Sequence, residues 1–336
     1  MKKILIDGNK KFYKANLHCH STNSDGAMSV EEIKELYKSN GYSVVAFTDH
    51  EHLIDNSYIN DEDFLTITSC EIAIKDGPAE VRPSRKMDMK VCHLNLYARD
   101  PQNVDTPCYN KLFDYHGSEE AMAKVVATCE PYDRIYSGEG ISEIIRIANE
   151  KGFFVSYNHP GWSLENATDY LGYKGIWAVE IYNTSCVMSG RNGYEINAYD
   201  DFLRAGHRVA CMATDDSHSA RTSCGGYVMI NADRLEYKTI IEALENHNFY
   251  ASTGPVINEL YIEDNNAVLT FEKGEYAVMH TKGRRVVKKM AENPDGTNTV
   301  QFEFLPEDGY IRFDVVDKND KRANTCAYFL DEIITK

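Results

Sequence analysis

Strand-like and helix-like segments alternate along the first two thirds of this 336-residue chain, and this alternation limits the possible folds more than any other feature. Seven apolar stretches predict β-strands at 13–19, 43–48, 65–69, 90–97, 153–157, 176–182 and 208–214. Helical patterns follow at 30–40, 141–151, 193–205 and 235–246, and the first begins with a capping box of Ser29 and Glu32. Such alternation predicts an α/β fold with parallel strands, whose chemistry gathers at the carboxyl ends of the strands.

Potential metal ligands stand at or near the ends of six of these strands. His18 and His20 are separated by one residue, so a strand presents both imidazoles on one face, and Asp25 follows in an expected loop. An isolated pair of this kind is equally compatible with two histidines that are hydrogen-bonded in a strand. Six of the eleven histidines fall at strand ends, which favours a metal site. The other candidates at strand ends are His50, Glu71, His93, His159, Asp216 and His218.

Charge and cysteine content exclude several classes of protein. A net charge of -16 repels a phosphate backbone, so we expect no extended nucleic-acid binding, although metal ions can reverse the local sign for a small anion. The nine cysteines form no CxxC pair, which favours reduced thiols and a cytoplasmic protein. We find neither a signal-peptide core nor an apolar run of ~18 residues, and therefore expect no membrane span.

The sequence changes character after residue 255. Short strand-like segments at 260–262, 267–271, 276–280, 300–304, 310–316 and 327–330 are separated by turn residues and predict a small all-β, sandwich-like domain. We therefore expect two domains, 1–255 and 256–336. Insertions at 76–89 and 100–140, the second with a helix over 119–128, are either lids that face the substrate or surface elaborations. The β domain is a docking surface, an oligomer contact or a structural cap.

The spacing of the candidate ligands resembles the polymerase-and-histidinol-phosphatase (PHP) family. The matching elements occur in the family's order: HxHSxxSDG at 18–26, TDH at 48–50, Glu71, His93, His159 and DxH at 216–218. The resemblance covers about residues 14–254. It is closest to stand-alone metal-dependent phosphoesterases, some of which carry a small β domain after a similar TGP turn, here 253–255. It implies a distorted, TIM-barrel-like (β/α)7 barrel.

The resemblance also implies a centre of three divalent metal ions. Three groups of ligands are implied: His18, His20, Glu71 and Asp216; then Glu71, His93 and His159; then Asp25, His50 and His218. The donor types suit Zn²⁺, Mn²⁺ or Fe²⁺. A metal-bound hydroxide, held by the pair of ions that Glu71 bridges, would hydrolyse a phosphate ester of a small molecule.

Other side chains have less specific patterns. Arg191 and Asn183 are candidates for binding the substrate, and Arg82, Arg85 and Arg134 are further cationic candidates on the insertions. For any single arginine, the alternative is a solvated surface residue. Cys19 is expected to pack on the opposite face from the two histidines, and Asp215 to cap or support its neighbours. We expect His52 and His116 at the surface.

Two other functions compete with phosphate-ester hydrolysis. Amidohydrolase-type metal-dependent hydrolases also use HxH on a first strand, but they often bridge their metals with a lysine, and the sequence shows no evident lysine at a strand end. The other alternative is a binding or scaffold protein with a non-catalytic metal site. The complete set of ligands and the DxH ending favour the phosphoesterase.

Overall fold

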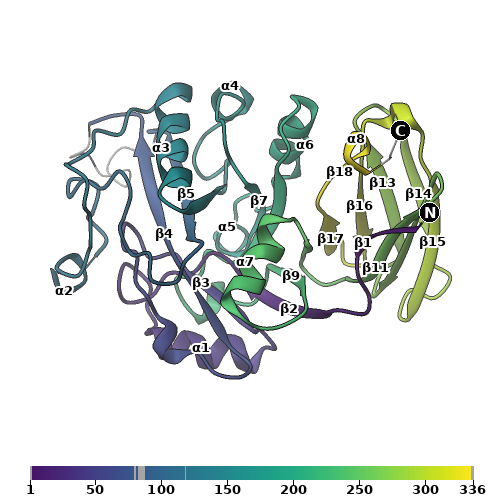
Figure 1. Cartoon of the computed structure of the whole chain (residues 1–336), viewed down its shortest axis with the longest axis horizontal. Coiled ribbons are helices and arrows are strands. Elements are labelled where there is room, and N and C mark those ends of the chain that lie inside the picture. Colours follow the sequence, from purple (N-terminus) through teal and green to yellow (C-terminus); the bar gives the residue numbers. More distant parts are fainter. Residues whose placement is uncertain (1, 79–80, 82–87, 118, 334–336) are drawn as a thin grey trace.

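The computed structural model describes residues 2–78, 81, 88–117 and 119–333, and its strands form one sheet of fourteen strands and one of four. The longer helices lie around the early strands, on the left and in the middle of Figure 1, whereas the later part of the chain on the right is almost entirely β-structure. Within the described ranges, we find no helix with the length and apolar character needed to cross a membrane. The protein is therefore a mixed α/β structure with an additional all-β sheet.

All seven strands expected before residue 215 are present as neighbours in the larger sheet. They are β2 (Lys11–Asn16), β3 (Val44–Phe47), β4 (Leu65–Lys75), β5 (Val91–Ala98), β6 (Phe153–Tyr157), β7 (Ala178–Asn183) and β8 (Ala210–Thr214). The strands β2 to β4 are parallel, as are β6 to β8, but β5 runs antiparallel to both of its neighbours. The expected all-parallel arrangement is thus wrong at β5. The described residues between β4 and β5 include no crossover helix, which a parallel return would need.

The carboxyl ends of β2 and β8 meet just beyond the strands. Cys19 and Ser217 form a parallel bridge there, and the N–H of His20 donates to the carbonyl oxygen of Ser217 at 2.8 Å. On its other side, β2 pairs with β9 (Tyr227–Ala232), and the sheet continues through β10 (Phe249–Ser252) into strands of the C-terminal region. This mixed and extended pairing does not confirm the expected (β/α)7 barrel.

The four longest helices of the described residues match the four that the sequence predicts. They are α1 (Val30–Ser39), α3 (Gly138–Glu150), α6 (Ile196–Arg204) and α7 (Tyr237–Glu245). The capping box at the start of α1 is confirmed, because Ser29 and Glu32 each accept a hydrogen bond from the other's backbone N–H. The helix expected over 119–128 is only a short turn. The shorter elements are α2 (Glu119–Met122), α4 (Ala167–Tyr170), α5 (Thr184–Met188), α8 (Leu330–Ile333), η1 (Ser57–Ile59), η3 (Ala220–Thr222) and η4 (Pro306–Asp308).

Two groups of strands enclose a separate apolar core in the C-terminal region. One is the four-stranded sheet β1 (Lys2–Ile6), β11 (Val256–Glu263), β12 (Asn266–Glu272) and β15 (Thr297–Glu303). The other is the end of the large sheet: β14 (Val286–Met290), β13 (Tyr276–Thr281), β16 (Tyr310–Val316), β17 (Arg322–Thr325) and β18 (Tyr328–Phe329). Phe271, Phe302 and Phe313 are buried between them. The N-terminal strand β1 joins this region by pairing with β11 (Figure 1).

Candidate metal centre

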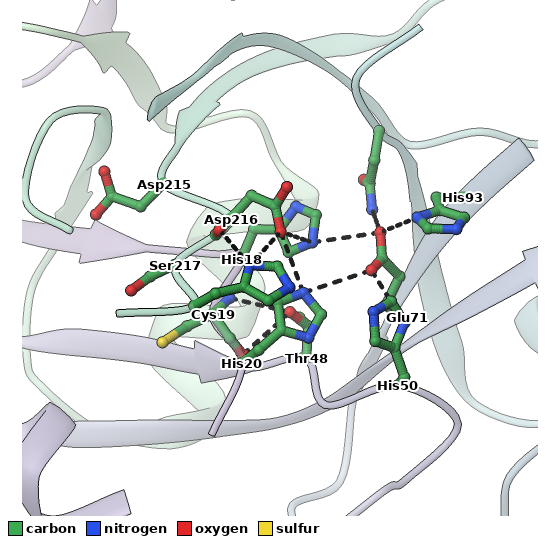
Figure 2. A network of polar contacts seen from close by, with 12 residues as sticks. His18, Cys19, His20, Thr48, His50, Glu71, His93, Asp215, Asp216 and Ser217 are labelled. Atoms are coloured by element: carbon green, nitrogen blue, oxygen red, sulfur yellow. Dashed lines mark hydrogen bonds and ion pairs between the residues drawn. The ribbon is translucent and has the colours of Figure 1, made fainter. Parts of the chain in front are cut away.

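Histidine rings surround the buried carboxylate of Glu71 where several strands of the large sheet end. His18 and His20 follow β2, His50 follows β3, and Glu71 lies within β4. His93 is near the start of the antiparallel β5 and pairs with Ala73, two residues after Glu71. It therefore lies near Glu71 although its strand runs the other way. Figure 2 shows these rings around the Glu71 carboxylate. Cys19 points to the opposite side from His18 and His20, as expected, and is buried among apolar residues of α1 and its neighbours.

The remaining candidate ligands come from loops with unusual backbone conformations. His159, after β6, has φ 25°, and Asp216, after β8, has φ 50°. Positive φ is uncommon for residues with a side chain and often marks a functional site. Asp25 returns to the cluster through a tight turn. The chain approaches itself so closely there that a Cβ on Gly26 would collide with the His20 carbonyl. The turn therefore requires glycine.

Four distances within the first group of donor atoms match the spacing between ligands of a tetrahedral ion. The Nε2 atom of His18 lies 3.3 Å from an oxygen of Glu71 and 3.3 Å from Asp216 Oδ1. The Nε2 atom of His20 lies 3.4 Å from the other oxygen of Glu71 and 3.2 Å from Asp216 Oδ1. Ligand atoms about 2.1 Å from a tetrahedral ion are about 3.4 Å from one another. His18, His20 and Glu71 could therefore share one ion, and Asp216 lies next to both histidines.

Two further groups adjoin the first. Glu71 Oε1 lies 3.0 Å from His93 Nδ1 and 3.3 Å from His159 Nε2. Asp25 lies 3.4 Å from His218 Nε2 and 3.7 Å from His50 Nε2. The donor atoms of this last group, together with His20, all lie within 4.8 Å of one another. The structure thus brings all nine expected ligands together, and it adds His20 to the third group.

Polar groups of the cluster are left without partners in a way that suits a bound cation. Three histidines have buried ring nitrogens that make no hydrogen bond: Nε2 of His18, both ring nitrogens of His20, and Nδ1 of His93. Among the described residues, the carboxylates of the cluster form ion pairs with histidines and with no lysine or arginine: Asp25, Glu71, Glu180 and Asp216. Buried negative charge needs compensation. Divalent cations would supply this charge and accept the unused nitrogen lone pairs.

A second layer of side chains orients the ligands, and the sequence analysis did not identify it. Glu180 on β7 accepts from His18 Nδ1 at 2.9 Å and from the His159 N–H at 2.8 Å. Asn158 donates to Glu71 Oε1 at 2.9 Å. Such partners fix the tautomer and the direction of a ligand. The available signal for Glu180 was its position as the one charged residue within a buried strand.

Mutual electrostatics keep the carboxylates ionised. Burial opposes ionisation of Glu71, but the charges of His93 and His18 outweigh it and hold its pKa well below the ordinary value. The pKa of Asp216 is lowered in the same way, chiefly by His18. Burial and the charge of His20 lower the pKa of His50. The neighbouring carboxylates outweigh burial and raise the pKa of His18, His159 and His218, the last to about 9. Because metal ions bind ionised carboxylates and neutral imidazoles, these three histidines would release protons when metal binds.

The 100–140 insertion contacts this cluster directly. The Nδ1 atom of His116 lies 2.8 Å from Asp25 Oδ2, and its ring stacks on His50 with centroids 4.2 Å apart. His52, which is 1% exposed, lies 2.9 Å from Asp114 of the insertion. The expectation of a surface position is wrong for His52, and the half-exposed His116 faces the cluster. These contacts favour the substrate-facing alternative for the insertion.

Arg134 holds the same insertion against the loop that carries His50. Its guanidinium donates to both carboxylate oxygens of Glu51, at 2.7 and 2.6 Å, and to the carbonyls of Cys108 and Ala73 at 3.0 Å. The side chain of Arg134 is completely buried. It is therefore neither a solvated surface residue nor available to a substrate. A buried cation inside an insertion cannot be recognised from its sequence.

A cavity of about 530 Å³ opens above the donor groups. Arg191 is the one arginine among its described lining residues, and its guanidinium makes no hydrogen bond or ion pair with the described part of the chain. Asn183 does not line the cavity, because its amide donates to Glu180 and Asp216 and its oxygen caps α5. Most of the 76–89 insertion, with Arg82 and Arg85, lies outside the described residues.

Two further expectations concern side chains beside the cluster. Lys75 does end β4, so a strand-end lysine is present after all, but its ammonium donates to the Val81 carbonyl at 3.0 Å and lies over the Phe113 and Tyr115 rings. Asp215 points away from the cluster (Figure 2) and accepts hydrogen bonds from Tyr37 and from backbone N–H groups of 224–226. Of the two expected roles of Asp215, capping of neighbouring backbone groups is the one observed.

Comparisons with known proteins found similarity in solved structures alone. No protein-family model and no curated protein matches the chain. A two-domain protein from Bacteroides vulgatus, described as containing a predicted PHP-like metal-dependent phosphoesterase, is 15% identical, with 96% of each chain covered and a TM-score of 0.43. An amidohydrolase from Chromobacterium violaceum is 14% identical over 70% of this chain and 96% of its own, with a TM-score of 0.42.

A lesion-specific endonuclease from Pyrococcus furiosus is 16% identical over 83% of this chain and 64% of its own, with a TM-score of 0.44. The similar structures thus include the family that the sequence motifs resemble. Because these TM-scores lie below 0.5, we base the function on the side chains of the site.

Proposed function

We propose that this protein is a metal-dependent phosphoesterase that hydrolyses a phosphate ester of a small molecule at a centre of three divalent ions. The observation that carries the proposal is the position of Glu71, whose two oxygens serve two adjoining groups of donor atoms beside a third. The imidazole and carboxylate donors suit Zn²⁺, Mn²⁺ or Fe²⁺. When bound, such ions supply an activated water molecule and positive charge for a phosphate.

The chain's own residues divide the remaining work. His18, His20, Glu71 and Asp216 would hold the first ion. His93 and His159 would hold the second with Glu71, and Asp25, His50 and His218 would hold the third. Glu180 orients His18, and Asn158 orients Glu71, through their hydrogen bonds. Arg191, at the cavity, would pair with an anionic oxygen of the substrate.

A covalent enzyme intermediate is not part of this proposal. Cys186 lines the cavity, but burial raises the pKa of its thiol, and a thiol that stays protonated is a weak nucleophile. Ser189, also at the cavity, donates its hydroxyl to the carbonyl of Cys186 at 2.9 Å, and no histidine of the described chain is in hydrogen-bond contact with it. Direct attack by water fits the site better than attack by either side chain, and Cys186 and Ser189 would only line the cavity.

The proposal includes the arrangement of the fold. The meeting of β2 and β8 at Cys19 and Ser217 supports a distorted barrel of seven strands within the larger sheet. The separate C-terminal core supports a division into residues 1–255 and 256–336, with β1 contributed to the second unit. The cavity suits a small substrate and not an extended nucleic acid.

Metal analysis combined with hydrolysis of 4-nitrophenyl phosphate tests the function. We expect bound metal after supply of Mn²⁺, Zn²⁺ or Fe²⁺, turnover of the ester, and loss of turnover when the ions are chelated. Bound metal without turnover of any phosphate ester would favour the scaffold alternative. Turnover of an amide or lactone but not of a phosphate ester would favour an amidohydrolase-type enzyme. A stable phosphoenzyme would contradict the mechanism.

A further inference from the structure

One wall of the cavity is apolar, although the donor groups beside it are charged. Met89, Val91, Trp162 and Leu164 form this wall. Met89 and Val91 are buried and pack with Trp162, which is itself only half-buried. Leu164 is 42% exposed. An apolar surface that a folded chain leaves open beside polar groups is typical of a site for an organic ligand.

Trp162 is held rigidly next to two of the proposed ligands. Its ring centroid lies 4.9 Å from that of His93 and 5.1 Å from that of His159. The neighbouring Ser163 donates its N–H to the His159 carbonyl at 3.1 Å, and its carbonyl accepts from Val91 at 3.2 Å. The indole N–H makes no hydrogen bond to the described residues. A fixed, half-open aromatic ring costs little entropy when a ligand covers it.

Leu164 is exposed at this wall, and its backbone adopts an unfavourable conformation. Its φ of 60° lies in the left-handed region, which is rare for a residue with a branched side chain. The next residue, Glu165, anchors the loop, because its carboxylate accepts hydrogen bonds from Tyr136 and Tyr157, each at 2.8 Å, and its N–H donates to the Pro160 carbonyl at 3.1 Å. The surrounding structure therefore holds a strained, exposed leucine at the cavity.

We propose that the wall of Met89, Val91, Trp162 and Leu164 binds a flat, apolar ring in the alcohol portion of the substrate. The inference rests on the proposed function and narrows it to phosphate esters of ring-bearing alcohols. The ring would leave water and stack on or against the indole. Because Trp162 lies beside His93 and His159, the ring must be close to the phosphate, as in an aryl or arylmethyl ester. A phosphate ester of a short polyol would leave the wall in contact with water.

Binding of two non-hydrolysable phosphonates separates this inference from catalysis. We would titrate the metal-loaded protein with phenylphosphonate and with methylphosphonate by calorimetry. The wild type should bind the phenyl compound about tenfold more tightly. Trp162→Ala should reduce this preference to about twofold, and Trp162→Phe, which keeps a flat ring and guards against misfolding, should retain most of it. Tyr58→Ala, which removes an exposed ring that does not line the cavity, should change nothing.

The outcomes distinguish the two proposals. Equal affinity for both phosphonates, no binding of either, or an unchanged preference in Trp162→Ala would overturn the apolar subsite. A preference that depends on Trp162, found in a protein that hydrolyses no phosphate ester, would support the subsite and reject the proposed hydrolysis. Hydrolysis of phenyl phosphate and glycerol phosphate with equal kcat/KM would reject the subsite and keep the proposed function.

Discussion

Replacement of Arg134 by methionine should destabilise the protein strongly and disturb the metal centre with it. The side chain lies in the interior and pairs bidentately with Glu51, the residue after His50. Methionine keeps the length of the side chain but removes its charge and all of its donors. Glu51 has φ 64°, so its backbone already lies in an uncommon conformation that its ion pair helps to hold.

The expected magnitude follows from what the substitution leaves behind. The carboxylate of Glu51, 2% exposed, would lose its one arginine partner, and an unpaired buried charge of this kind costs ~3–5 kcal/mol. The carbonyls of Cys108 and Ala73 would also each lose a donor. Total stabilities of domains are about 5–15 kcal/mol, so this loss is large. Glu51→Gln combined with Arg134→Met should cost clearly less than the sum of the single changes, because the two side chains interact.

Urea unfolding of the full chain, followed by circular dichroism, measures these differences, and metal analysis reports the site. The matched control is Arg146→Met, because among the described residues this arginine pairs only with the exposed Glu143 and Glu150 on α3. Its urea midpoint and metal content should equal those of the wild type. A change of less than about 1 kcal/mol for Arg134→Met, or strict additivity in the double variant, would refute the reasoning.

Three further predictions follow from other contacts. Glu71→Gln should lose metal from two groups of ligands and nearly all turnover, whereas Asp25→Asn should keep that pair and mainly raise KM; metal content and kinetics decide, and a fully loaded, active Glu71→Gln contradicts the bridging role. His116→Gln should lower kcat/KM about tenfold, because it removes the ring beside Asp25, and unchanged kinetics would argue against this. Burial opposes ionisation of Asp314, but Arg312 outweighs it and lowers the pKa of Asp314 below its ordinary value of 3.8. As pH falls, the carboxylate of Asp314 is protonated in the unfolded chain before it is protonated in the folded chain. Its contribution to the free energy of unfolding is therefore present above about pH 4 and is lost as pH falls further. Asp314→Asn should make the free energy of unfolding less dependent on pH in that range, as measured by urea unfolding at several pH values.

The sequence predicted the centre better than its surroundings, and the reason is physical. The expected strand 13–19 ends at Asn16, but the chain stays extended through the Cys19–Ser217 bridge, so the alternation of side chains still places His18 and His20 on one face. The direction of β5 depends instead on the segment before it, which has no regular hydrophobic pattern. The prediction therefore placed His93 correctly near the other ligands but gave its strand the wrong direction. The contacts of His116 and Arg134 depend on how a long insertion packs, and no local periodicity encodes such packing.

The pairing of β1 with β11 has a consequence for how the chain assembles. Lys2 pairs with Glu263 and Ile6 with Leu260, so β1 has its hydrogen-bonding partner in β11, which is made only after all the strands from β2 to β10. Ile6 is completely buried in the C-terminal core. During synthesis β1 must therefore wait with its edge unpaired while the intervening strands and helices form. Contacts of such long sequence separation slow folding and expose the chain to aggregation, so completion of the C-terminal core should be a late step of folding.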